Sequence, residues 1–293
     1  MSMIQAKNLT KNYGRLKALD GIDFEVRKGE VFGFIGPNGA GKSTTIRIIL
    51  GLLRKNGGDV TLLGGDPWRD AVELHKRLAY VPSDVSLWPN MTGGEVIDLL
   101  TGLRGSLDKK RRAELIERFS LDPTKKCRAY SKGNRQKVAI IAAFVSDVEL
   151  YILDEPTSGL DPLMEMVFQQ CVNEAKQAGK TVFLSSHILA EVEKLCDRIS
   201  IIKDGRIVEA GTLAELRHFT RTSITVETER QLDGLSALRG VHNVRTDGMK
   251  VSFNADSEEL GKILEHISRF GVKALSSVPP TLEELFMRHY SIK

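Results

Sequence analysis

A glycine-rich run ending in Lys-Ser-Thr constrains this chain more than any other part of its sequence. Residues 36 to 44 read Gly-Pro-Asn-Gly-Ala-Gly-Lys-Ser-Thr, after the apolar residues 31–35 and before the helical pattern 45–50. A strand, a glycine-rich loop and a helix in this order let backbone N–H groups surround a phosphate. Glycines allow the tight turn, and the helix directs its partial positive end to the same point. The sequence therefore predicts a bound nucleoside phosphate.

Two side chains of this run carry most of the expected chemistry. Lys42 is expected to reach the β- and γ-phosphates, and the hydroxyl of Ser43 is expected to ligate Mg²⁺. The predicted nucleotide-binding residues of the run are Gly36, Pro37, Asn38, Gly39, Ala40, Gly41, Lys42, Ser43 and Thr44. The alternative is an ordinary glycine-rich turn, which the motifs below weigh against.

Composition excludes several classes of protein. The chain of 293 residues suits one large domain and a small one, with 41% hydrophobic and 27% charged residues. A net charge of +4 is too small to indicate nucleic acid, so no nucleic-acid partner is expected. No apolar run approaches the roughly 20 residues that span a bilayer, and no signal peptide is recognisable. A membrane role therefore requires a partner, and three cysteines without metal-site spacing suggest reduced thiols in the cytosol.

Two further strand ends carry polar residues. Residues 150–155 form a buried-strand pattern that ends in Asp154 and Glu155. This geometry is typical of an Asp that holds Mg²⁺ beside a phosphate loop, with the next carboxylate placed to act as general base on water. After the apolar residues 181–184, His187 is a candidate to contact a γ-phosphate or the attacking water. A lone histidine is more often structural, so the residues alone leave that role open.

In their order, these motifs resemble those of the ATP-binding subunits of ABC transporters over roughly residues 1–215. Tyr13 is similar to the aromatic residue that stacks on adenine, and residues 36–44 and 150–155 are similar to the Walker A and Walker B motifs. Residues 158–161 resemble the D-loop, with Asp161, and His187 resembles the switch histidine. The resemblance implies an ATPase with Mg²⁺ as cofactor, in which Lys42, Glu155 and His187 are catalytic and Ser43 and Asp154 hold the metal.

A fifth motif, the family signature, is matched by residues 130–136. Its candidate residues are Ser131, Lys132, Gly133 and Asn134. Ser131 is a good N-cap for the helix that follows, whose first N–H groups are free. In the family this helix start faces the ATP bound on the opposite subunit. The resemblance therefore implies a homodimer or heterodimer that encloses two ATP molecules and drives a membrane permease, at the cytoplasmic face of the membrane.

The sequence departs from the family at two places. Ser83 stands where the family usually has glutamine, and we hypothesise that this serine makes metal coordination looser or water-bridged. Lys132 and Asn134 replace a glycine and a glutamine of the signature. The ammonium of Lys132 adds a charge directed at phosphate, or it is a solvated cation at a helix start. Both interpretations are open.

The order of predicted elements indicates an α/β fold with two domains. Residues 1–216 are expected to form a P-loop NTPase of ABC type, a mixed sheet with antiparallel N-terminal strands and a helical insert at about 84–145. Residues 221–293 are expected to form a small α+β domain with the ferredoxin-like order β-α-β-β-α-β. Its first helix is predicted at 232–238, and a further helix is predicted at 281–286 after the last strand. A regulatory or dimer-stabilising role is the interpretation of this domain.

The apolar loop 85–91 allows two interpretations. Its side chains, including Trp88, pack under the domain, or they form a groove that receives a short helix from a membrane subunit. The resemblance favours a subunit that powers export of drugs or other small molecules, because similar C-terminal additions occur in drug exporters. The alternatives are a soluble ABC ATPase in translation or DNA repair, and a weakly hydrolysing regulatory subunit of a heterodimeric transporter.

Overall fold

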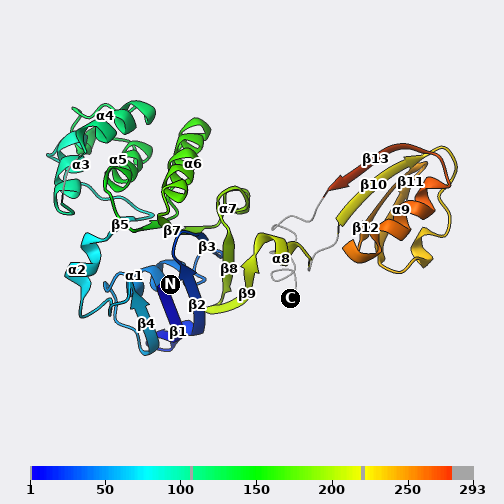
Figure 1. Cartoon of the computed structure of the whole chain (residues 1–293), viewed down its shortest axis with the longest axis horizontal. Helices are drawn as coiled ribbons and strands as arrows, with labels where there is room; N and C mark the ends of the chain where they lie inside the picture. Colours follow the sequence, from blue (N-terminus) through cyan, green and yellow to red (C-terminus); the bar gives the residue numbers. More distant parts are fainter. Residues whose placement is uncertain (1, 106–107, 219–221, 279–293) are drawn as a thin grey trace. The chain divides into compact units, whose positions relative to one another are not determined.

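The computed structural model describes residues 2–105, 108–218 and 222–278. The chain divides into two compact units, one up to Ala210 and one from Gly211, which we call the N-terminal and C-terminal units (Figure 1). Each unit has its own hydrophobic core. Within the described ranges, no helix combines the length and the apolar character needed to cross a bilayer.

The antiparallel strands of the N-terminal unit form a sheet of their own. It consists of β1 (Ser2–Tyr13), β2 (Leu16–Arg27) and β4 (Gly57–Leu62), with β1 in the middle and antiparallel to both neighbours. Apolar side chains alternate along β2, so that Ile22, Phe24 and Val26 are buried between more exposed residues. This alternation is typical of a sheet that is covered on one face. The expected antiparallel N-terminal strands are confirmed.

A second sheet carries the strands on which the phosphate loop and the carboxylates were predicted. Its strand order is β5 (Leu78–Val81), β6 (Leu150–Asp154), β7 (Thr181–Ser186), β3 (Val31–Ile35), β8 (Arg198–Lys203) and β9 (Arg206–Thr212). The first five strands are parallel, and β3, β6 and β7 are buried along their whole length. The register pairs Ile35 with Ser186 and Asp154 with Ser185. The carboxyl ends of three strands therefore meet at one edge.

Helices cover this sheet and build the insert. Their bounds are α1 (Lys42–Ile49), α2 (Ala71–Lys76), α3 (Gly93–Gly102), α4 (Lys109–Arg118), the short η1 (Cys127–Ala129), α5 (Lys132–Val145), α6 (Pro162–Gln177) and α7 (Leu189–Leu195). Helices α3 and α4 both pack on α5 and form a helical layer beside β5 (Figure 1). The expected capping box at the start of α3 is present, since Thr92 and Glu95 bond each other's backbone N–H.

Helix α1 ends at Ile49, one residue before the end of the helical pattern 45–50. It ends because Gly51 has φ 67°, and a Cβ there would lie 2.0 Å from the carbonyl oxygen of Pro67. A glycine in the left-handed region commonly terminates a helix. The chain then turns towards β4 and returns to the antiparallel sheet.

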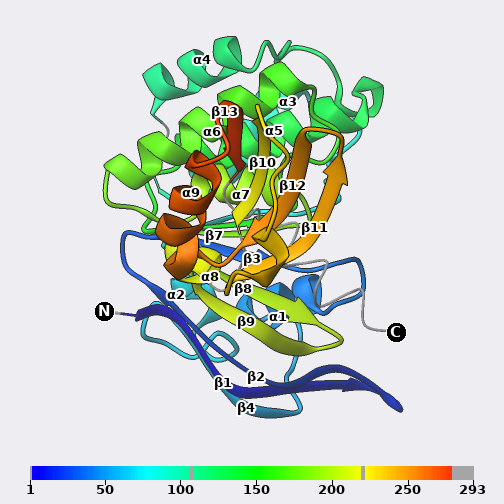
Figure 2. The same cartoon turned by 90° about the vertical axis from the view of Figure 1, so that its right-hand side faces the viewer.

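The C-terminal unit has a four-stranded antiparallel sheet with the order β11-β12-β10-β13 (Figure 2). Its elements are α8 (Leu213–His218), β10 (Thr222–Thr228), η2 (Leu235–Ala237), β11 (Val241–Asp247), β12 (Lys250–Ala255), η3 (Ser257–Glu259), α9 (Leu260–Ser268) and β13 (Val272–Val278). Ile263 and Ile267 of α9 pack with Phe253 and Val226 in one apolar core. The four expected strands and the second helix are present.

The prediction of a first helix in the β-α-β-β-α-β order is wrong. Residues 232–238 contain only the single turn η2, because Gly234 has φ 74° and interrupts any regular helix. Leu232, Leu235 and Leu238 still pack on the core, and their spacing of three suits one tight turn as well as a helix. The further helix predicted at 281–286 lies outside the described residues.

Candidate nucleotide site

The glycine-rich run forms a tight loop between β3 and α1. A Cβ on Gly36 would lie 2.4 Å from the carbonyl oxygen of Ile202, so only glycine fits there. Gly41 is the N-cap of α1 with φ 115°, a conformation that other residues rarely adopt. The loop is fixed by the N–H of Gly205, which donates to the carbonyl of Ala40 at 3.0 Å. These contacts shape the backbone before any ligand is bound.

Three side chains predicted to be catalytic come together beside this loop. The Nζ of Lys42 lies 3.1 Å from the Oε1 of Glu155, and the Oε2 of Glu155 lies 3.3 Å from the Nδ1 of His187. They come from the start of α1, the end of β6 and the end of β7, respectively. The Lys42 side chain is 5% exposed and also donates to the carbonyl of Gly36 at 2.7 Å. The carboxylate of Glu155 thus contacts an ammonium group through one oxygen and an imidazole through the other.

The backbone of Glu155 is held in an unusual conformation. Its φ is 48°, in the left-handed region that non-glycine residues rarely adopt. Its N–H donates to the carbonyl of Ser185 at 3.0 Å, and its carbonyl accepts from the N–H of Ser158 at 3.1 Å. Such a backbone persists only where the surroundings fix it. The direction of the Glu155 side chain is therefore set by β7 and by the turn that follows β6.

The oxygen atoms available for a metal ion are a hydroxyl and a carboxylate. Asp154 is 2% exposed and accepts a hydrogen bond of 2.5 Å from the hydroxyl of Ser185, and Ser43 lines the cleft beside Lys42. In the part of the chain that the structure describes, no three His, Cys, Asp or Glu side chains are grouped to hold a metal. Mg²⁺ commonly takes one or two protein oxygens and completes its shell with phosphate and water. Ser43 and Asp154 suit that requirement when a phosphate is bound.

The cleft over the loop has a volume of about 370 Å³. Of the predicted residues, those that line it are Tyr13, Pro37, Asn38, Gly39, Gly41, Lys42, Ser43, Thr44 and Glu155. Sequence reasoning missed five more lining residues, which are Leu16, Lys17, Ala18, Asp204 and Gly205. An Asp-Gly pair between two apolar runs indicates a two-residue hairpin turn, so the last two were recognisable as a turn. Nothing in the sequence indicates that this turn reaches the cleft.

Two predicted residues lie at the margin of this arrangement. Tyr13 ends β1 and is 46% exposed, with the Nζ of Lys11 5.2 Å from its ring centre. An aromatic face is therefore available at the cleft. Ser83 lies two residues after β5, half-buried, and is not among the residues that line the cleft. The preceding carbonyl, of Pro82, accepts from the side-chain amide of Gln136 in α5 at 3.4 Å.

The signature residues lie against the D-loop segment, residues 158–161, of the same chain. Ser131 caps α5 by accepting from the N–H of Asn134 at 3.3 Å. Lys132 donates to the hydroxyl of Ser158 at 2.9 Å, and a Cβ on Gly133 would lie 2.4 Å from the carbonyl of Gly159. None of these residues lines the cleft of their own chain. Asp161 likewise lies outside it and caps α6, accepting from the N–H of Met164 at 3.0 Å.

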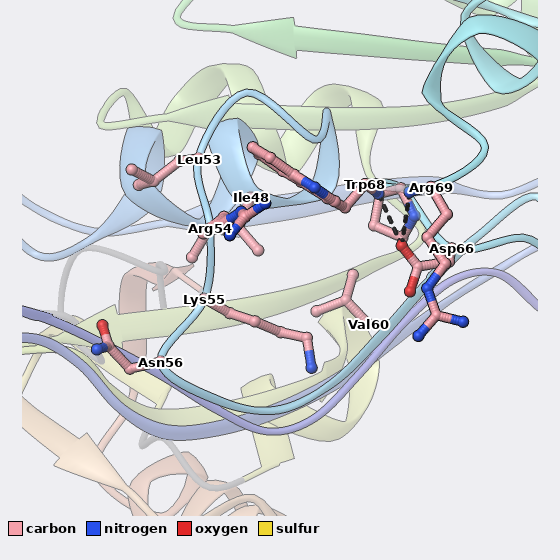
Figure 3. Close-up of a pocket in the computed structure, with 10 residues that line it drawn as sticks. Ile48, Leu53, Arg54, Lys55, Asn56, Val60, Asp66, Trp68 and Arg69 are labelled. Carbon is pink, nitrogen blue, oxygen red and sulfur yellow. Dashed lines mark hydrogen bonds between the residues drawn. The ribbon is translucent and has the colours of Figure 1, made fainter.

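A different pocket of about 350 Å³ lies beside β4 and α1 (Figure 3). The guanidinium of Arg54 lies 4.5 Å from the ring centre of Trp68. Asp66 accepts from the N–H groups of Trp68 and Arg69 and closes the loop at one end of the pocket (Figure 3). None of the motifs predicted from the sequence lies in this pocket.

Comparisons with known proteins agree with this geometry. The sequence model of the family described as "ABC transporter" matches residues 19–158, and that of the "ATP-binding protein DrrA1-3-like, C-terminal domain" matches residues 211–290. The linearmycin resistance ATP-binding protein LnrL of Bacillus subtilis is 32% identical over 97% of this chain and 97% of its own length. The daunorubicin/doxorubicin resistance ATP-binding protein DrrA of Streptomyces peucetius is 34% identical over 97% of this chain and 91% of its own length.

Solved structures match the ATPase part. One described as an ATP-binding subunit of an ABC transporter has a TM-score of 0.69 and 34% identity, covering 74% of this chain and 93% of its own. A dimeric ATP-binding cassette in a post-hydrolysis state, bound to ADP and phosphate, has a TM-score of 0.65 and 28% identity. It covers 72% of this chain and 99% of its own. With these matches and a Walker A loop facing a carboxylate, the chain belongs to the ATP-binding proteins of ABC transporters and is an ATPase.

Proposed function

We propose that the chain is the ATP-hydrolysing subunit of an exporter, which pairs around two ATP molecules and drives a separate membrane permease. The observation that carries this proposal is the meeting of Lys42, Glu155 and His187 beside the glycine-rich loop. An ammonium for the phosphate, a carboxylate for the water and an imidazole beside that carboxylate are groups that suit cleavage of a terminal phosphate.

Binding of ATP would use groups of the cleft that are already placed. The loop N–H groups and Lys42 hold the phosphates, and Tyr13 stacks on the purine. Ser43 and Asp154 hold Mg²⁺, with Ser83 as a further oxygen ligand, direct or through water. When bound, the metal neutralises charge on the phosphate oxygens. Support comes from the hard oxygen donors of Ser43 and Asp154 and from the aromatic face of Tyr13.

In the proposed reaction, Glu155 is the general base. Its carboxylate now pairs with Lys42, and a triphosphate would give the ammonium other oxygens to contact. Glu155 is then available to accept a proton from water as the water attacks the terminal phosphorus, while the bond from this phosphorus to the bridging oxygen breaks and ADP leaves. His187, which contacts the other oxygen of Glu155, orients the water or donates to the phosphate. The unusual backbone of Glu155 keeps this carboxylate directed at the cleft.

Pairing of two subunits would complete each site. The signature residues do not line the cleft of their own chain. Ser131 is the N-cap of α5, so the first N–H groups of this helix lie next to it. We propose that this start, from Ser131 to Asn134, contacts the phosphates bound by a second ATP-binding subunit, as implied by the family. Asp161 would lie at the same contact. Loss of the terminal phosphate then removes the bridge, and the subunits part.

Contact with a permease would use the Trp88 groove, a hollow of about 370 Å³. Its lining includes Leu50, Leu52, Tyr80, Val85, Leu87 and Trp88. Trp88 is 50% exposed and Leu52 is 62% exposed, an arrangement suited to a short amphipathic helix. We propose that such a helix of the permease fits here, which places the chain at the cytoplasmic face of the membrane. Relatives named for antibiotic resistance support export of small molecules.

Steady-state ATP turnover tests the proposed chemistry. Glu155→Gln keeps the size of the side chain and removes the base, so turnover should fall by about a hundredfold or more. Glu117→Gln, the same change at an exposed position of α4, should hydrolyse ATP like wild type. Chelation of Mg²⁺ should stop ATP turnover by wild type and by Glu117→Gln. Equal turnover of wild type and Glu155→Gln would refute the role of Glu155 as general base.

Isolation of the assembled complex tests the partner. Tagged wild-type chain, solubilised from membranes in mild detergent with ATP, should retain a protein with membrane-spanning helices. Recovery with ribosomes or DNA instead would favour an ABC ATPase of translation or repair. A regulatory subunit would be indicated if this chain paired only with a second, different ATP-binding chain and hydrolysed little ATP by itself.

A further inference from the structure

Helix α7 carries a buried glutamate for which the proposed reaction has no role. Glu191 is 5% exposed, and its Oε2 accepts a hydrogen bond of 2.7 Å from the hydroxyl of Ser186. The same hydroxyl accepts from the N–H of Ile188 at 3.0 Å. These two bonds tie together the residues on either side of His187. Glu191 therefore reaches the turn that carries the imidazole without reaching the cleft.

The position of His187 depends on this turn. The His187 side chain is 49% exposed, and its contact with Glu155 is a single one of 3.3 Å. Packing around the ring is therefore slight, so the backbone decides where the imidazole points. At the next residue, Ile188, the backbone is extended and α7 begins without a side-chain cap. The Ser186 hydroxyl accepts from the N–H of Ile188 and so holds the backbone of the turn immediately before the helix.

The environment of Glu191 shows that this buried carboxyl does not stabilise the fold. Its Oε1 has no hydrogen-bond partner among the described residues, and none of their ion pairs includes it. Burial raises the pKa of Glu191 to about 7, opposed by the hydrogen bond from Ser186 and reinforced by the charges of Glu165 and Glu155. A buried carboxyl with one unpaired oxygen is destabilising compared with an apolar side chain of similar size.

We propose that Glu191 is a positioning residue for His187: through the Ser186 hydroxyl it fixes the turn that directs the imidazole at Glu155. This inference rests on the proposed role of His187. Removal of the carboxylate releases the Ser186 hydroxyl, and the imidazole is then no longer held beside Glu155. Nucleotide binding should change little, because Glu191 and Ser186 do not line the cleft.

The first test compares ATP turnover and KM for four variants of the full chain. Glu191→Ala and Ser186→Ala should lower kcat by about tenfold and leave KM within about twofold, as expected for misplacement of a reacting group. Glu191→Gln keeps an oxygen that accepts from Ser186 and should retain most of the kcat. Lys194→Ala removes a charged side chain from an exposed position of the same helix and should match wild type. Unchanged kcat in both Ser186→Ala and Glu191→Ala would overturn the proposal.

A second test separates positioning from loss of stability. If Glu191 acts through His187, then His187→Ala/Glu191→Ala is no slower than His187→Ala alone. A further tenfold loss in the double variant would overturn the proposal, because a general structural defect adds to the loss of the imidazole. If Glu191→Ala does not fold, Ser186→Ala paired with His187→Ala gives the same comparison.

The two proposals fail in different ways. A His187→Ala variant with wild-type turnover contradicts the role of His187 itself, and the positioning role of Glu191 falls with it. A slow His187→Ala together with a fast Glu191→Ala and a fast Ser186→Ala overturns only the inference about Glu191. Slow turnover in all three, without additivity, supports both proposals.

Discussion

The two units of this chain differ most in what they bury. Three charged side chains are buried in the described residues, namely Lys42, Asp154 and Glu191, and all belong to the N-terminal unit. The core of the C-terminal unit is apolar, built around Phe253 and the inner face of α9. Burying a charge is destabilising unless partners compensate it. The buried charges therefore lower the stability of the N-terminal unit, whereas the core of the C-terminal unit carries no such cost.

A substitution in the C-terminal core should give the largest change in stability. Phe253→Ala leaves a cavity in the apolar core and should destabilise the C-terminal unit by about 3 to 5 kcal/mol. The chain has two tryptophans, Trp68 and Trp88, both in the N-terminal unit. Urea unfolding followed by circular dichroism should therefore shift, while tryptophan fluorescence and ATP turnover stay near wild type.

The matched control is Met249→Ala, at an exposed position between β11 and β12, which should leave both transitions unchanged. A large loss of turnover in Phe253→Ala would break the comparison, because chemistry would then depend on the C-terminal core.

The buried glutamate should make the N-terminal unit sensitive to pH. The pKa of Glu191 rises from about 4.5 to about 7 on folding, so the folded state holds more protons between these values. Its contribution to stability therefore falls as pH rises from about 5 to 7. Glu191→Gln does not titrate, so its stability relative to wild type should increase by roughly 3 kcal/mol between pH 5 and pH 8. Urea unfolding followed by tryptophan fluorescence measures this difference.

Val72→Ala, at an exposed position of α2, provides the reference, because it removes no titratable group and its stability relative to wild type should stay constant with pH. A constant difference for Glu191→Gln as well would show that this carboxyl keeps its ordinary pKa in the folded chain.

The side chains that we propose to be catalytic could be named from the sequence, because chemistry limits which residue types can serve at which strand ends. A phosphate loop requires glycines, and a metal and a water require carboxylates, so Gly36, Lys42 and Glu155 stand out in sequence. Glu191 does not stand out, because a glutamate in a helix is usually solvated and its burial depends on how α7 packs beside β7. The turn at Gly234 was missed for a related reason, since leucines three residues apart suit a helix and a single turn equally.

Two glycines offer a comparison of the units at the level of single atoms. Gly36→Ala places a Cβ 2.4 Å from a backbone oxygen and should displace the phosphate loop, lowering turnover by about a hundredfold. Gly261→Ala adds the same atom in α9, where nothing lies within 4 Å. It should leave turnover unchanged and stabilise the helix slightly. Similar turnover in the two variants would contradict the view that the loop backbone is essential.

The smallest effect is expected outside the cleft, at the Trp88 groove. Trp88→Ala should reduce transport in cells that contain the cognate permease by about tenfold, while ATP turnover of the isolated chain stays within about twofold. Trp68→Ala is a close control, because Trp68 is 48% exposed and Trp88 50% exposed. Equal transport by both variants would place the permease contact elsewhere.

The most direct measurement of the central claim is association that depends on ATP. The Glu155→Gln variant, mixed with ATP and Mg²⁺ and followed by light scattering, should change from single chains to pairs. It should remain single with ADP, and also with ATP when Lys42→Ala is added. If the mass does not change with ATP, and Lys42→Ala alone hydrolyses ATP as fast as wild type, the account of a nucleotide-clamped pair is contradicted.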